Sequence, residues 1–171
     1  MEEATLVSTY QELVRPLYAY VSRRCGGDRS LAEDVTQEAW LRAVAAWKKS
    51  GLPDNPLAWL KTVSKNLLLN YYRRAPMISM DALPNDWEER VLGEGIGKEN
   101  SDHAAAVSWG LARLRPGQAR LIEAFHLDGQ RVKDIATELG LSERAVEGRL
   151  RRARLDLRKK LEPLVGTEGG S

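Results

Sequence analysis

The chain has 171 residues, of which 43% are hydrophobic and 29% are charged, and it carries 26 basic side chains against 24 acidic ones. This composition is typical of one globular domain or two small ones, and it excludes a collagen, a disulfide-linked scaffold and a purely charged tail. No apolar run approaches the roughly 18 residues that a membrane-spanning helix needs, and no secretion signal follows Met1. We therefore expect a cytoplasmic protein without membrane insertion.

Charge is distributed unevenly along the chain. Residues 1–74 hold 11 basic and 8 acidic side chains, residues 75–102 hold 2 and 7, and residues 103–171 hold 13 and 9. The acidic middle stretch also contains two prolines and three glycines without a sustained helical period, which is typical of a linker. We therefore expect one domain over residues 1–75, an acidic linker over 76–103, a second domain over 104–165 and a disordered tail over 166–171.

Three apolar stripes at helical spacing predict a bundle of three or four helices in the first domain. The first stripe, over residues 10–21, ends before the turn at Gly26. The second, over residues 32–47, ends before Gly51, which suits a helix C-terminus. Asn55 can cap a third helix with a proline in its first turn, and the predicted apolar face of this helix consists of Leu60, Val63, Leu67 and Tyr71.

The second domain also shows only helical patterns. Two short helices are predicted on either side of Pro116. Apolar residues then recur at helical spacing over 132–139 and 146–161, separated by a turn with Gly140 for a positive φ and Ser142 as a cap. A short helix, a turn and a longer helix form a helix-turn-helix. No alternating strand pattern of useful length occurs, so we expect an all-α fold of two small helical domains.

The long helix of this helix-turn-helix is strongly basic. Residues 144–160 carry eight Lys and Arg against two acidic residues. Helical spacing places four residues on the face opposite the apolar stripe: Arg144, Gly148, Arg151 and Arg152. Such a face fits the major groove of DNA, where guanidinium groups contact phosphates and base edges. Glu147 would repel phosphate unless its carboxylate accepts a hydrogen bond from a cytosine amino group. The alternative interpretation of residues 144–160 is a solvated basic helix end.

The end of the third predicted helix carries a second polar surface, formed by Lys61, Lys65, Asn66, Asn70, Arg73 and Arg74. Amides can read bases and cations can hold phosphates. The neighbouring rings of Trp59, Tyr71 and Tyr72 could stack on unpaired bases. At these spacings, however, aromatic residues fit a buried core equally well.

The second predicted helix has an acidic and amide face away from its tryptophans. This face places Asp34, Gln37, Glu38 and Leu41 at positions i, i+3, i+4 and i+7. Carboxylates around one exposed leucine suit docking on a basic helix of another protein. The same residues could also be ordinary solvated surface.

Four segments match a known pattern in the same order and at the same spacing: LAEDVTQEAWLRAV over 31–44, AWLKTVSKNLLLNYYRR over 58–74, LRPGQ over 114–118 and DIATELGLSERAVEGRLRRAR over 134–154. Together they resemble the extracytoplasmic-function group of bacterial sigma factors in the sigma-70 family. The resemblance covers roughly residues 8–74 and 104–161. It implies a protein that binds core RNA polymerase and directs promoter-specific initiation, without being an enzyme itself.

The resemblance also implies a partner for each polar surface. Core RNA polymerase would contact Asp34, Gln37, Glu38, Leu41 and Arg42. The −10 element of promoter DNA would be melted and captured by Lys61, Ser64, Lys65 and Asn66, and held at its upstream edge by Asn70, Arg73 and Arg74. The duplex −35 element would face Arg144, Glu147, Gly148, Arg149, Arg151 and Arg152. An anti-sigma factor that covers both domains is a further expected partner.

Two positions of the basic helix depart from the family pattern. Glu147 stands where Lys or Arg is usual, and Gly148 stands where Ser is frequent. The −35 sequence therefore cannot be transferred from better-known members. The acidic linker resembles the family's connector, which threads the polymerase cleft, and its negative charge would mimic nucleic acid there.

Two other classes of function remain as alternatives. A free-standing repressor or activator would bind its operator without polymerase and would need to dimerise, because one helix-turn-helix buries little surface. An enzyme acting on nucleic acid is disfavoured, because Cys25, His103 and His126 do not make up a metal-ligand set and residues 93–98 miss the phosphate-loop spacing. We therefore expect no metal and no cofactor.

Overall fold

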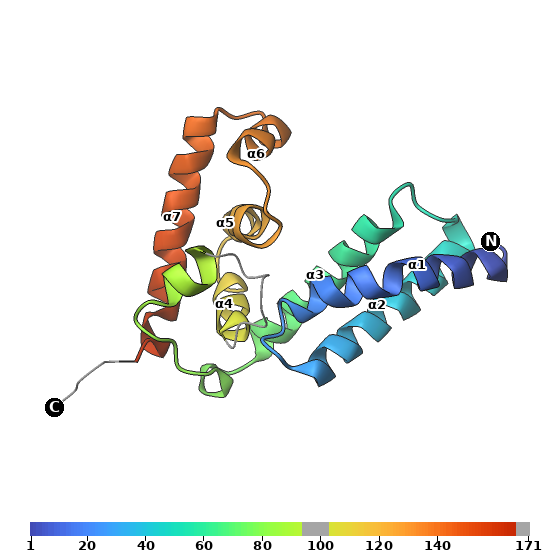
Figure 1. The fold of residues 1–171 in the computed structure, drawn as a ribbon, viewed down its shortest axis with the longest axis horizontal. Helices are drawn as coiled ribbons and strands as arrows, with labels where there is room; N and C mark the ends of the chain where they lie inside the picture. Colours follow the sequence, from blue (N-terminus) through green and yellow to red (C-terminus); the bar gives the residue numbers. More distant parts are fainter. Residues whose placement is uncertain (94–102, 167–171) are drawn as a thin grey trace.

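The structure is a computed structural model that describes residues 1–93 and 103–166. The N-terminal domain consists of α1 (Glu3–Ser22), α2 (Arg29–Ser50) and α3 (Pro56–Arg74); the C-terminal domain consists of α4 (Ala104–Leu111), α5 (Pro116–Ile122), α6 (Val132–Leu139) and α7 (Glu143–Leu161). Figure 1 shows these as two groups of helices that meet near the end of α3. The expected all-α fold of two domains is confirmed. In the parts of the chain that the structure describes, no helix is long and apolar enough to cross a membrane.

The helices of the N-terminal domain begin and end at residues that favour helix termini. The Asp28 carboxylate accepts a hydrogen bond from the Leu31 amide at 3.0 Å, and the Asn55 side chain accepts one from the Ala58 amide at 3.0 Å. Each satisfies an amide that has no partner inside its helix. α2 ends just before Gly51, whose φ of 80° is strained for residues with a Cβ. The three predicted helices of this domain are confirmed.

A tryptophan cluster forms the core of the N-terminal domain. Trp47 on α2 is 2% exposed, and its ring centroid lies 6.0 Å from that of Trp40 and 5.4 Å from that of Trp59 on α3. Trp40 in turn meets the ring of Tyr10 on α1 at 5.0 Å. Aromatic pairs in tilted or edge-to-face arrangements contribute about 0.5–1.5 kcal/mol beyond the area they bury. The cluster therefore holds all three helices together.

The predicted apolar face of α3 is wrong by one residue. The buried residues are Leu60, Ser64, Leu68 and Tyr72, whereas Tyr71 is 45% exposed. Residues 67–69 are three consecutive leucines, so the apolar pattern fits two faces of the helix. Packing decides between the two faces, because the buried Tyr72 hydroxyl donates to the Arg24 carbonyl at 3.0 Å and so anchors α3 to the end of α1.

The C-terminal domain contains the predicted helix-turn-helix. Gly140 ends α6 in the left-handed conformation with a φ of 65°, and the Ser142 hydroxyl caps α7 by accepting from the Ala145 amide at 3.1 Å. Val146, Leu150 and Leu157 on α7 are fully or almost fully buried. A π-helical turn, η3 (Glu123–Leu127), directly follows α5. The recognition-type helix is therefore held along one whole side by the domain core.

The first part of the expected linker is packed against the C-terminal domain. It includes two short helical turns, η1 (Met77–Ser79) and η2 (Glu88–Gly93), and its buried residues are Leu83, Trp87, Val91 and Leu92. The Leu83 amide donates to the Leu164 carbonyl at 2.8 Å, and the Gly166 amide donates to the Leu83 carbonyl at 2.9 Å. We call residues 83–92 the strap. Residues 94–102 of the expected linker and 167–171 of the expected tail lie outside the described ranges.

Two side chains of the C-terminal domain hold the strap. The Arg158 guanidinium forms an ion pair with Glu88 through two nitrogens, one of them 2.8 Å from the carboxylate. His126 donates from Nδ1 to the Leu92 carbonyl at 2.7 Å and accepts from Arg154 at Nε2. Burial lowers the pKa of His126, and the Arg154 charge lowers it further, so the ring is neutral and can accept that bond. A segment without helical periodicity is thus ordered by long-range contacts.

α4 and the residues that follow it contact the N-terminal domain. The Trp109 indole donates to the Ala75 carbonyl at 2.9 Å, and the Arg113 guanidinium, stacked on the Trp109 ring at 3.6 Å, donates to the Tyr72 carbonyl at 3.0 Å. The Ser108 hydroxyl donates to the Arg24 carbonyl at 3.0 Å. Carbonyls at a helix C-terminus lack partners within their own helix. Side chains of the C-terminal domain therefore cap the ends of helices in the N-terminal domain.

Candidate nucleic-acid interface

The exposed side of α7 carries the cationic face that the sequence indicates. Arg144, Glu147, Arg149, Arg151 and Arg152 are all exposed, and Gly148 lies among them. A Cβ built on Gly148 would meet nothing within 4 Å, so the backbone is open to a close approach there. Among the described residues, none forms an ion pair with these four arginines. Their charge is therefore available to a polyanion.

The candidate surface on α3 is only partly exposed. Asn66, Asn70, Arg73 and Arg74 are exposed, whereas Lys61 is half-buried with its amine 5.2 Å from the centre of the Tyr20 ring. Lys65 forms an ion pair with Glu123 of the C-terminal domain. Lys65, one of the residues assigned to the −10 element, is therefore in contact with the C-terminal domain.

Ser64 is placed in the core, which corrects its assignment to the DNA-facing surface. Its exposure is 0%, and its hydroxyl oxygen has no hydrogen-bond partner among the described residues. The physical reason is the helical period, because Ser64 follows Leu60 and precedes Leu68 by four residues each on the buried face. A small side chain at this position lets the helices approach closely without contacting solvent.

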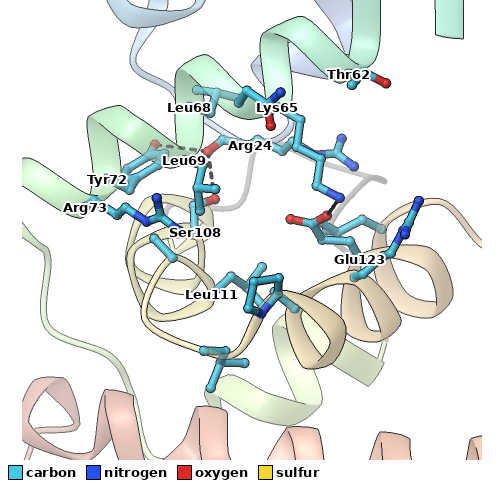
Figure 2. A pocket seen from close by; sticks show the side chains of 17 residues that line it. Arg24, Thr62, Lys65, Leu68, Leu69, Tyr72, Arg73, Ser108, Leu111 and Glu123 are labelled. Carbon is cyan, nitrogen blue, oxygen red and sulfur yellow. Dashed lines mark hydrogen bonds and ion pairs between the residues drawn. The ribbon is translucent and has the colours of Figure 1, made fainter. Parts of the chain in front are cut away.

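A cavity of about 320 Å³ lies between the two domains beside this surface. Lys65, Asn66 and Arg73 line it from α3, while Ser108, Leu111 and Glu123 line it from the C-terminal domain. Figure 2 shows Lys65 and Glu123 pointing towards each other on one side of the lining, with Arg73 on the other side. Polar residues assigned to the −10 element thus border a space that residues of the C-terminal domain line from the other side.

The face of α2 is exposed as its spacing indicates. Asp34 and Gln37 are exposed, Leu41 is 66% exposed, and Glu38 pairs with Arg42 at 3.0 Å in an i, i+4 ion pair. Such an exposed pair contributes only about 0.3–0.5 kcal/mol, so both residues can exchange it for contacts with a partner.

An apolar groove of about 460 Å³ adjoins this face and extends onto α1. It is lined by Leu6, Val7, Tyr10, Trp40, Leu41 and Val44. The sequence placed Tyr10 on the core stripe, but it is 47% exposed, and Val7 is 49% exposed. The sequence pattern does not show that these two residues are exposed. An apolar residue at the edge of a helical stripe fits the same period whether its side chain is buried or exposed.

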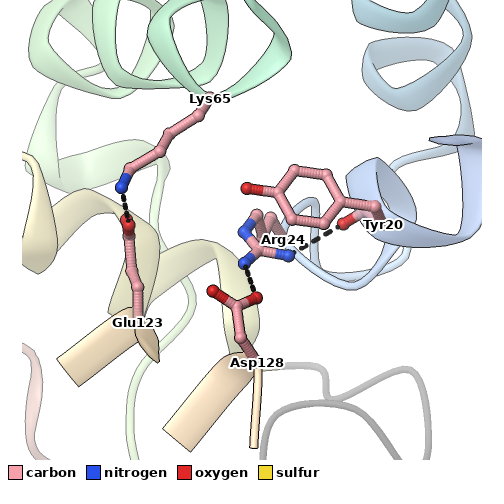
Figure 3. Close-up of polar contacts among 5 residues, drawn as sticks. All are labelled: Tyr20, Arg24, Lys65, Glu123 and Asp128. Carbon is pink, nitrogen blue, oxygen red and sulfur yellow. Dashed lines mark hydrogen bonds and ion pairs between the residues drawn. The ribbon is translucent and has the colours of Figure 1, made fainter. Parts of the chain in front are cut away.

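The structure also identifies residues that sequence reasoning missed. Arg24, Glu123 and Asp128 form polar contacts between the domains, as Figure 3 shows. No local pattern marks them, because each contact joins residues far apart in the chain. In the described ranges, no three His, Cys, Asp or Glu side chains are grouped to hold a metal ion. Burial raises the pKa of the Cys25 thiol to about 12, which leaves it unreactive near neutral pH.

Family models match both domains. The model of sigma-70 region 2 matches residues 9–76, and that of sigma-70 region 4 matches residues 110–157. The ECF RNA polymerase sigma factor SigE of Mycolicibacterium smegmatis is 31% identical over 160 residues, which cover 90% of this chain and 62% of that protein. The ECF RNA polymerase sigma factor SigL of Mycobacterium tuberculosis is 29% identical over 167 residues, which cover 95% of this chain and 92% of that protein.

These matches agree with the geometry. The region 2 match contains the α2 and α3 surfaces, and the region 4 match contains the helix-turn-helix with its exposed arginines. The two regions follow each other in one chain with the strap between them. The chain belongs to the extracytoplasmic-function group of the sigma-70 family.

Proposed function

We propose that this protein is an initiation factor for bacterial RNA polymerase that binds the core enzyme and directs it to promoters. The observation that carries this proposal is the presence of regions 2 and 4 in one chain, each with an exposed polar surface. In this proposal, residues 1–75 bind core polymerase and the −10 element. Residues 104–165 bind the −35 element, and residues 76–103 connect the two units.

The α2 face is the proposed contact with core polymerase. Asp34, Gln37 and Glu38 supply acceptors for a basic partner helix, and Arg42 remains available once its pair with Glu38 opens. Leu41, which is 66% exposed, supplies an apolar anchor in the middle of these polar groups. An apolar centre inside a polar rim is the usual composition of a protein interface.

The two DNA surfaces have different tasks. The arginines of α7 hold duplex DNA at the −35 element, because an α-helix fits the major groove. Asn66 and its neighbours on α3 bind unpaired bases of the −10 element, and Arg73 and Arg74 hold adjacent phosphates. Opening of the duplex follows from tighter binding to the single strand than to the double strand, so no catalytic group is needed.

Run-off transcription tests this function. Genomic promoter fragments are transcribed by bacterial core polymerase with and without the protein, and a gel shift measures binding of the protein alone. We expect new transcripts only when both components are present, since two small DNA surfaces gain avidity only when polymerase sets their separation. A tight shift without polymerase and no new transcript would support a free-standing regulator instead.

Replacement of Arg152 by Ala is expected to weaken promoters that depend on the −35 element. Loss of a good base contact costs about 1–3 kcal/mol, or roughly 5- to 150-fold in affinity. The measurement is competition between promoters with intact and altered −35 elements. Arg15→Ala, which removes an exposed arginine from α1, is the control for the charge change and should alter neither promoter. Equal losses on both promoters would show that Arg152 contacts only phosphate.

Replacement of Asn66 by Ala is expected to spare closed-complex binding and reduce open complex. The amide is exposed on α3, so its loss leaves the fold intact while removing a contact made only to unpaired bases. Permanganate reactivity of thymines in the −10 element measures opening. Asn85→Ala, at an exposed asparagine of the strap, is the matched control. Unchanged reactivity in Asn66→Ala would remove Asn66 from the −10 surface.

A further inference from the structure

A carboxylate stands among the exposed arginines of α7. Glu147 is exposed and follows Arg144 by three residues and precedes Arg151 by four, so the three side chains are neighbours on the helix surface. The same i, i+4 arrangement gives an ion pair between Glu38 and Arg42 on α2. Glu147 forms no ion pair with any residue that the structure describes. Its carboxylate is therefore available to a hydrogen-bond donor outside the chain.

This carboxylate is unfavourable beside the backbone of DNA. Phosphates attract Arg144 and Arg151 but repel Glu147, which lies between them. The base edges in the major groove include hydrogen-bond donors, namely the amino groups of cytosine and adenine. When the arginines of α7 hold the two phosphate backbones, the favourable partner for the Glu147 carboxylate is therefore an amino group of a base.

The major-groove edges of the four bases rank the possible partners. Guanine and thymine present acceptors, O6 and N7 or O4, which repel a carboxylate. Adenine presents its N6 amino group beside the N7 acceptor, so a carboxylate at adenine meets attraction and repulsion together. Cytosine presents the N4 amino group without a neighbouring acceptor on that edge. The expected order of preference is cytosine first, adenine second, and guanine and thymine last.

Gly148 allows the helix backbone to approach the bases closely. A glutamate side chain is shorter than an arginine side chain, so the backbone must lie deeper in the groove for a carboxylate to reach a base edge. A Cβ built on Gly148 would meet nothing within 4 Å, so no packing contact among the described residues requires a glycine there. Glycine inside a helix is less stable than alanine. A reason for Gly148 therefore lies in what the exposed face of α7 binds.

We propose that Glu147 determines specificity within the −35 element, where its carboxylate accepts a hydrogen bond from the N4 amino group of a cytosine and Gly148 lets the helix come close enough. This inference rests on the proposed function, because it names a base that the proposed −35 surface reads. Promoters of this protein then share a C·G pair at one fixed position of the −35 element, with cytosine on the strand that faces Glu147.

Selection from randomised DNA tests the assignment of Glu147. Core polymerase with the full chain binds a pool of duplexes that keep one promoter found by run-off transcription but carry a random −35 region, and the bound DNA is sequenced. We expect wild type to prefer cytosine over guanine or thymine at one position by roughly 5- to 30-fold. Glu147→Ala should lose this preference at that position and keep the preferences at the others.

Glu162→Ala is the matched control for the change in charge. Glu162 is exposed and lies just beyond the end of α7. Both variants lose one negative charge, which strengthens binding to every sequence alike, and the ratio between bases at one position removes this uniform gain. Glu162→Ala should therefore keep the wild-type preference for cytosine.

Gly148→Ala tests the close approach of the backbone. The added methyl group holds the helix away from the bases, so we expect a weaker preference for cytosine at the position that Glu147→Ala affects. Alanine also favours the helix, so the thermal midpoint should rise. A loss of preference in a more stable variant is not caused by unfolding. A Gly148→Ala variant that keeps the full preference would overturn the role of Gly148.

Two results would overturn the assignment of Glu147. The first is a wild-type selection with no position that prefers cytosine. The second is a Glu147→Ala variant that changes affinity for all sequences equally, since the carboxylate then acts only on phosphates or on Arg151. Absence of transcripts with wild-type protein and core polymerase would instead refute the proposed function. Normal transcription from promoters that lack the cytosine refutes this inference alone.

Discussion

Replacement of Trp47 by Ala is expected to lower the stability of the N-terminal domain by about 3–5 kcal/mol. Trp47 is 2% exposed and lies between the rings of Trp40 and Trp59, so its removal leaves a large cavity at the point where α2 meets α3. A domain of this size has a total stability of roughly 5–10 kcal/mol, so the variant is close to unfolding. Urea denaturation followed by circular dichroism measures the change.

Leu41→Ala on the same helix is the control for this effect. Leu41 is 66% exposed, and a substitution at such a position changes stability by about 0.5 kcal/mol or less. Trp47→Phe keeps an aromatic ring in the cluster and should lose less than Trp47→Ala. Similar urea midpoints for Trp47→Ala and Leu41→Ala would mean that the tryptophan cluster does not hold the domain together.

Replacement of Gly26 by Ala is expected to separate α4 from the end of α1. Gly26 has a φ of 57°, and a Cβ there would lie 2.8 Å from the backbone nitrogen of Ala105. The left-handed conformation costs a residue with a Cβ about 1–2 kcal/mol, and overpacking against backbone adds about 1–3 kcal/mol because α4 must move. Thermal unfolding and the radius of gyration measure the loss of stability and the separation.

Gly27 provides the matched control. It also has a positive φ, of 83°, but a Cβ built on it meets nothing within 4 Å. Gly27→Ala should therefore lose only the conformational part, about 1–2 kcal/mol, and leave the domains in contact. If the two variants lose equal stability and keep the same radius of gyration, the approach of α4 to this turn is looser than the structure shows.

The exposure of the candidate surfaces was predictable to different extents. The exposed arginines of α7 and the exposed face of α2 follow from helical spacing alone, because each lies opposite an apolar stripe on a single helix. The α3 surface was harder, because its three consecutive leucines allowed two buried faces, and Ser64, which the resemblance assigned to the DNA-facing surface, lies on the buried face. Tyr10 shows the same difficulty at the edge of the α1 stripe.

The sequence by itself determined the helices, their ends and the helix-turn-helix, since caps, turn glycines and apolar periods act over a few residues. Only the tertiary structure decided which face of α3 is buried, that the strap packs beside α7, and that Glu123 and Asp128 reach across to the N-terminal domain. The physical reason is sequence separation. The partners of Arg24 include a residue 104 positions away, and a contact of that kind exists only after the helices have packed.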